Sequence, residues 1–94
     1  MIEVTQTGNS DPLEFDVLVS DGKGTTRHQV TMARGNFESL THGTCAPERC
    51  IEAAFRFLLD REPKEAILAC FDVTVISRYF PEFETELPRY IAQG

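Results

Sequence analysis

Basic residues are scarce in this chain and do not gather anywhere along it. The 94 residues include nine Lys and Arg against fifteen Asp and Glu, which gives a formal net charge of −6. The basic residues are scattered from Lys23 to Arg89 without forming a patch. Phosphate backbones and anionic lipids repel an acidic chain of this kind. We therefore expect neither nucleic acid nor a membrane among its partners.

Long apolar runs are also missing. No stretch approaches the roughly 20 apolar residues that a membrane-spanning helix requires. The opening sequence, MIEVTQTG, has no basic segment followed by an apolar one, so we expect no signal peptide. Cysteine occurs only three times, and three cysteines cannot all pair within one chain. These absences together predict a reducing, cytoplasmic location.

The motifs that usually mark catalysis or cofactor binding are absent. The sequence has no P-loop, no GxGxxG, no HExxH and no GxSxG. Asp60, Glu62 and Glu65 surround Pro63, and we interpret them as a solvated junction between helices rather than an acid–base pair. We therefore expect no cofactor, and we favour a protein that is not an enzyme.

What the sequence does contain is a clear β-hairpin pattern. Apolar residues occupy every odd position from 13 to 19, the period of a strand with one buried face. A turn at Gly22 and Lys23, a Gly-X pair suited to type II′ geometry, would pair this strand with residues 26–32. Both apolar rows then share one face, with Asp16 and Gln29 on the other. The expected pairs on the apolar face are Leu13–Met32, Phe15–Val30, Val17–His28 and Val19–Thr26.

Residues 46–63 predict the central helix of the fold. Pro47 suits its first turn. At 100° per residue, its apolar positions cover roughly 240° of the circumference, far more than a surface helix needs. The helix must therefore be covered on two sides. A weaker helical pattern precedes it at residues 33–43, where Gly43 would end the helix.

Three further helical segments are expected in the last third of the chain. They would start at Pro63, after the capping residue Asp72, and at Pro81. Pro88 would end or kink the last of them. The inward-facing positions would be Ile67, Leu68 and Phe71, then Val75, Ile76, Tyr79 and Phe80, then Phe83 and Leu87.

These patterns predict a single α+β domain over residues 1–94. Residues 1–32 would form an antiparallel hairpin or, with a short strand through Ile2 and Val4, a three-stranded meander. Residues 33–94 would supply three to four short helices, one of them nearly buried.

Residues 55–83 contain three short motifs, FLLxREP, ILxxFD and YFP. In these motifs the segment resembles the C-terminal half of a family of small uncharacterised bacterial proteins. That family has no established activity. The resemblance therefore implies a bacterial origin and adds no catalytic residues.

The stretch HGTCAPERC, residues 42–50, concentrates the reactive side chains of the chain. Cys45 would lie before or within the first helical turn, where the helix N-terminus and His42 favour a thiolate. That describes a redox or acyl-transfer nucleophile. No CxxC, oxyanion loop or third orienting residue accompanies the pair. We favour the plainer interpretation, the start of a helix with an incidental cysteine.

Zinc is a further hypothesis for the same stretch. His42, Cys45 and Cys50 would supply three ligands and Cys70 a fourth. Structural zinc sites, however, usually place their ligands in two close pairs. Cys50 and Cys70 both lie in apolar patterns, so we expect them to pack in the core and no metal to bind.

Two other candidate sites are interpreted as structural. His28 falls on the apolar face of the hairpin, where we expect a hydrogen-bonded histidine of the core or of the sheet edge. Residues 64–80 could be mistaken for a helix-turn-helix, but Arg78 would be the sole cation of its recognition helix. DNA binding is therefore not favoured.

The leading functional hypothesis is a non-catalytic cytosolic bacterial module that binds or regulates another protein. Its affinity would rest on exposed aromatic side chains near the C-terminus or on an open strand edge, and exposed aromatic clusters mark binding surfaces. The alternative is a thiol-dependent activity at Cys45 with His42, and the oligomeric state stays open. The expected binding residues are Tyr79, Phe80, Phe83 and Tyr90, which would otherwise close one end of the core.

Overall fold

The structure is a computed structural model that describes residues 1–93. The strands are β1 Ile2–Gly8, β2 Leu13–Asp21, β3 Gly24–Met32 and β4 Cys70–Asp72. They form one sheet in the order β1-β2-β3-β4. The first three strands form the predicted antiparallel meander, and β4 runs parallel to β3 as an addition to the predicted sheet.

The predicted register of the hairpin is confirmed. Phe15 lies opposite Val30 on the inner face, and Asp16 lies opposite Gln29 on the outer face. The odd residues of β2 from 13 to 19 and the even residues of β3 from 28 onward are buried, because they face the helices. A shift of one residue between the two strands would have moved the apolar row of one of them to the solvent face.

The turn of the hairpin differs from the predicted geometry. Gly22 and Lys23 are its two central residues, as expected. A type II′ turn needs a positive φ at the first of them. The positive φ falls instead on Gly24, at 140°, a backbone conformation that glycine adopts without steric cost. The Asp21 carboxylate accepts a hydrogen bond from the Lys23 amide at 2.7 Å and stabilises this form of the turn.

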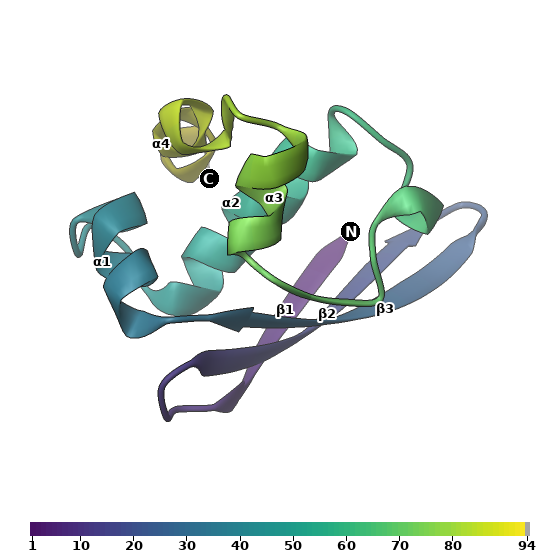
Figure 1. The fold of residues 1–94 in the computed structure, drawn as a ribbon. Helices are drawn as coiled ribbons and strands as arrows, with labels where there is room; N and C mark the ends of the chain where they lie inside the picture. Colours follow the sequence, from purple (N-terminus) through teal and green to yellow (C-terminus); the bar gives the residue numbers. More distant parts are fainter. Residues whose placement is uncertain (94) are drawn as a thin grey trace.

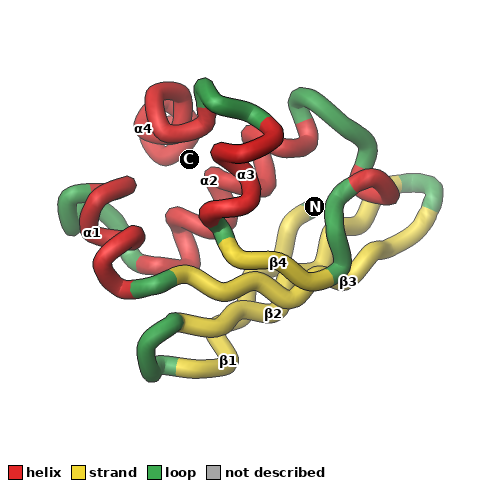
Figure 2. Tube along the Cα trace, in the orientation of Figure 1, coloured by secondary structure: helices red, strands yellow, loops and turns green. Residues whose placement is uncertain are grey.

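The helices cover one face of the sheet and leave the other face to solvent (Figures 1 and 2). The uncovered face is mostly polar; on it Arg27 forms a bidentate ion pair with Asp16 at 2.9 and 2.8 Å. The helical segments are α1 Arg34–Thr41, α2 Pro47–Leu59, the 3₁₀ turn η1 Lys64–Ala66, α3 Thr74–Tyr79 and α4 Phe83–Gln93. None of these helices is both long and apolar enough to cross a membrane.

The central helix α2 is nearly buried, as predicted. Pro47 occupies its first turn, and seven of its thirteen residues are buried. Phe55 has no exposed surface and lies between His28 and Phe71, with ring centroids 5.4 and 6.0 Å away. The sheet covers one side of α2, and α4 packs against another (Figure 1).

Residues 63–72 do not form the predicted helix. A single 3₁₀ turn follows Pro63, and β4 then pairs with the free edge of β3. The parallel pairing satisfies backbone groups at both ends, through Gln29 N–H to Ala69 O at 2.8 Å and Val73 N–H to Thr31 O at 2.9 Å. Residues 64–80 are therefore not a helix-turn-helix. Short apolar runs are ambiguous between strand and helix, and here the open sheet edge decides the outcome.

The strand in place of a helix changes which side chains are buried. In β4 Phe71 points inward, and its neighbour Cys70 is exposed. The prediction that Cys70 packs in the core is therefore wrong. Leu68, expected to face inward, is 48 % exposed, whereas Ile67 is buried as predicted.

His28 is a hydrogen-bonded core histidine, as predicted. Its ring is buried in β3, with Nδ1 2.7 Å from the Leu68 carbonyl and Nε2 2.8 Å from the Thr26 hydroxyl. The first contact joins the sheet to the chain that leads into β4. It satisfies a main-chain carbonyl at a point where the chain is in neither helix nor strand.

The C-terminal helices start as expected, but the last one runs further. The Asp72 carboxylate accepts hydrogen bonds from the Thr74 amide and hydroxyl, at 3.0 and 2.7 Å, at the start of α3. Helix α4 begins two residues after Pro81 and continues past Pro88 to Gln93, so Pro88 does not end it. Phe83 and Leu87 face the core, as predicted.

Candidate functional site

The histidine–cysteine stretch forms the loop between α1 and α2. His42 ends α1 in a left-handed conformation with φ at 52°, and its side chain is exposed. Cys45 is half-buried, and in residues 1–93 no hydrogen bond joins its sulfur to the His42 ring. Burial raises the pKa of the Cys45 thiol and outweighs the opposing charge of Arg49. A nucleophilic cysteine requires the opposite shift.

Cys50 behaves as a small core residue. It is buried in α2, and its Sγ lies 3.8 Å from Met32 Sδ. Burial raises the pKa of its thiol to about 12, so the thiolate is not accessible near neutral pH. The expectation of core packing is confirmed for Cys50. In the described part of the chain, no three His, Cys, Asp or Glu side chains gather in a way that could hold a metal ion.

The three thiols are therefore expected to differ in reactivity, and alkylation with iodoacetamide measures this directly. Cys70 should react fastest because it is exposed, Cys45 more slowly, and Cys50 only on unfolding. The rate at Cys45 should rise with pH through a midpoint above the roughly 8.5 of a free thiol. A midpoint below that value, lost in His42→Ala, would establish thiol chemistry at Cys45.

The four aromatic side chains expected to form a binding surface are divided between core and surface. Phe83 and Tyr90 are only 1 % and 4 % exposed, so the expectation of an exposed set is wrong for these two. Both pack edge-on against Phe57, with ring centroids 5.1 and 5.7 Å away. The Tyr90 hydroxyl donates to Asp60 at 2.5 Å. These two aromatic rings attach α4 to α2.

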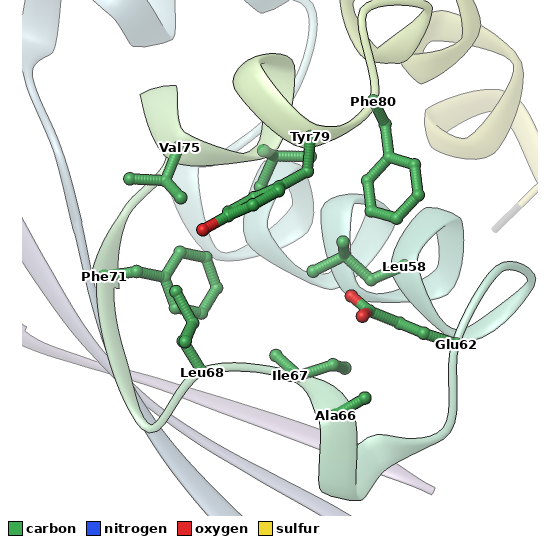
Figure 3. Close-up of a pocket in the computed structure, with 10 residues that line it drawn as sticks. Leu58, Glu62, Ala66, Ile67, Leu68, Phe71, Val75, Tyr79 and Phe80 are labelled. Atoms are coloured by element: carbon green, nitrogen blue, oxygen red, sulfur yellow. The ribbon is translucent and has the colours of Figure 1, made fainter.

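The other two aromatic residues, Tyr79 and Phe80, help to line a pocket. The pocket has a volume of about 300 Å³ and lies between the end of α2, the segment from η1 to β4, and α3. Figure 3 shows Tyr79 lying across it, with Phe71 and Leu68 on one side and Phe80 on the other. Its lining residues are Leu58, Glu62, Ala66, Ile67, Leu68, Phe71, Val75, Ile76, Tyr79 and Phe80.

Glu62 supplies the charged group of this lining. Its carboxylate points into the pocket, towards Leu58 and Ile67 (Figure 3). Burial raises the pKa of this carboxyl, because the apolar walls solvate the ionised form poorly. In residues 1–93 no side chain forms an ion pair with it.

The two basic residues nearest to Glu62 in the sequence have other partners. Arg61 stacks on the Phe57 ring, 3.6 Å from its centroid, and pairs with Glu82 at 3.1 Å. Lys64 is buried and pairs with Asp21 at 3.1 Å and with Glu65 at 2.5 Å. The three acids predicted to form one solvated junction therefore have different surroundings, and of the three only Glu62 lines the pocket.

The pocket was not evident from the sequence, because it depends on β4 replacing the predicted helix. Ile67, Leu68 and Phe71 would share one helix face, whereas in the structure Leu68 turns outward to the rim. A partial signal was present in Glu62, an acid between two apolar segments with basic residues close on both sides.

No protein-family model, no curated protein and no solved structure matches the chain.

Proposed function

We propose that the protein is a non-catalytic interaction or regulatory module that holds an apolar side chain of another protein in the pocket between α2, η1 and α3. The observation that carries this proposal is the open apolar pocket with two exposed apolar residues at its rim. A bacterial origin and a cytosolic setting belong to the same proposal. The resemblance of residues 55–83 supports the first, and three free cysteines support the second.

The rim favours a protein partner over a small molecule. Tyr79 is 68 % exposed and Leu68 48 % exposed, and both border the pocket. Large apolar side chains exposed next to one another commonly mark interaction sites. A small ligand inside the pocket would leave the outer surfaces of both side chains in water. A partner surface would cover them together with the pocket.

The dimensions of the pocket indicate one inserted side chain. A volume of about 300 Å³ is at the lower end of the range for ligand sites. It suits a single aromatic or large aliphatic group, held against the Phe71 and Phe80 rings. In protein interfaces such anchors dominate the binding energy, and the surrounding contacts mainly exclude water. Tyr79 and Leu68 are placed to form those surrounding contacts.

Peptide selection tests the proposal without the partner having to be identified first. A random peptide library displayed on phage is selected on the immobilised wild-type protein. We expect enrichment of peptides with one aromatic or large aliphatic anchor. Their affinity should fall about tenfold or more for Tyr79→Ala and for Leu68→Glu, because both changes disrupt the rim.

A matched control separates loss of the pocket from a general effect of the added charge. Leu18→Glu makes the same replacement on the outer face of β2, away from the helices, and should leave binding unchanged. Thermal unfolding of each variant establishes that it is folded. Selected peptides that bind Tyr79→Ala and Leu68→Glu as tightly as the wild type would contradict the proposal.

A further inference from the structure

Among the side chains that line the pocket, Glu62 carries the charge. Nine of the ten lining residues present carbon surface, with the Tyr79 hydroxyl as the polar end of one of them. The tenth, Glu62, brings a carboxylate that points inward (Figure 3). A carboxylate accepts hydrogen bonds and donates none when ionised. The pocket therefore offers apolar contact together with one acceptor of negative charge.

This carboxylate lacks the counter-charge that nearby acids have. Asp21 and Glu65 share Lys64, and Glu82 pairs with Arg61. Arg78, next to Tyr79 on α3, does not line the pocket. Across residues 1–93 Glu62 has no ion-pair partner, although it is half-buried beside apolar walls. A bound partner that carries a positive charge would stabilise the ionised form of such a partly desolvated carboxylate.

From this arrangement we infer that the occupant is an apolar group with a positive charge attached, and that Glu62 receives the charge. The inference rests on the proposed function and names its specificity: a partner segment with a Lys or Arg beside its apolar anchor. Charge complementarity also acts at longer range, because the net charge of −6 attracts basic segments and repels acidic ones.

Three small probes of similar shape isolate the effect of charge. Phenethylammonium carries the cation, 2-phenylethanol is its neutral counterpart, and 3-phenylpropionate carries an anion. Each is titrated into ¹⁵N-labelled protein, and amide shifts at Glu62, Leu68 and Tyr79 report occupancy of the pocket. We expect the ammonium to bind about tenfold more tightly than the alcohol, and the carboxylate most weakly.

Two carboxamide variants assign the preference to one carboxylate. Glu62→Gln keeps the shape of the side chain and removes its charge, so the ammonium and the alcohol should bind about equally. Glu65→Gln makes the same change next to Lys64, outside the pocket lining, and should retain the preference. Equal binding of the three probes to the wild type, binding of none, or a preference that survives in Glu62→Gln would overturn the inference.

The peptide selection distinguishes failure of this inference from failure of the proposed function. Selection on Glu62→Gln should retain apolar anchors and lose the enrichment of neighbouring Lys and Arg. Anchors enriched on the wild type without basic neighbours would overturn the inference and leave the proposed function standing. If the selected peptides bind Leu68→Glu and Tyr79→Ala as tightly as the wild type, the proposed function is contradicted instead.

Discussion

The variant Phe55→Ala is expected to be largely unfolded at room temperature or to melt far below the wild type. Phe55 has no exposed surface and contacts two strands of the sheet, β3 through His28 and β4 through Phe71. Its truncation removes apolar burial and leaves a cavity at the centre of the fold, at a cost of about 3–5 kcal/mol. The whole stability of a small domain is typically about 5–15 kcal/mol, so this loss is decisive.

Thermal unfolding followed by circular dichroism measures the effect. For a domain of this size the midpoint should fall by more than about 10 °C. Phe37→Ala is the matched control, because Phe37 on α1 is only partly buried at the margin of the core. It should cost much less. A melting temperature of Phe55→Ala equal to that of the wild type would show that α2 is not the buried centre.

The second large effect is expected for Phe83→Ala. Phe83 is buried against Phe57 and fixes α4 on α2, so its truncation should also cost about 3–5 kcal/mol. Tyr79→Ala provides the contrast, since Tyr79 is mostly exposed and its loss should change stability by no more than about 0.5 kcal/mol. Urea unfolding of both variants measures the difference. If Phe83→Ala is as stable as the wild type but fails to bind peptides, Phe83 belongs to the binding surface rather than to the core.

The hairpin of β2 and β3 could be predicted because its signals are local. Alternation along residues 13–19 and 26–32 sets the buried face, and a two-residue turn sets the register. Helix α2 could be predicted equally well, since its apolar arc is too wide for a surface helix. In both cases the information lies within a short window of sequence, and the neighbours in space merely confirm it.

β4 could not be predicted because its partner is distant in the sequence. Residues 67–71 are apolar enough for a helix or a strand, and the choice depends on the unpaired edge of β3. The same applies to the aromatic residues near the C-terminus. Phe83 and Tyr90 are buried because Phe57 lies opposite them, whereas Tyr79 has no such neighbour and stays exposed. The pocket depends on both outcomes, so the sequence alone did not locate it.

The two contacts of His28 determine the tautomer of its ring. A main-chain carbonyl can only accept a hydrogen bond, so the nitrogen facing Leu68 O, Nδ1, must carry the proton. In the neutral ring Nε2 is then the unprotonated nitrogen and accepts the Thr26 hydroxyl hydrogen. The protonated Nδ1 thus anchors the main chain at Leu68, a residue on the rim of the pocket, to strand β3.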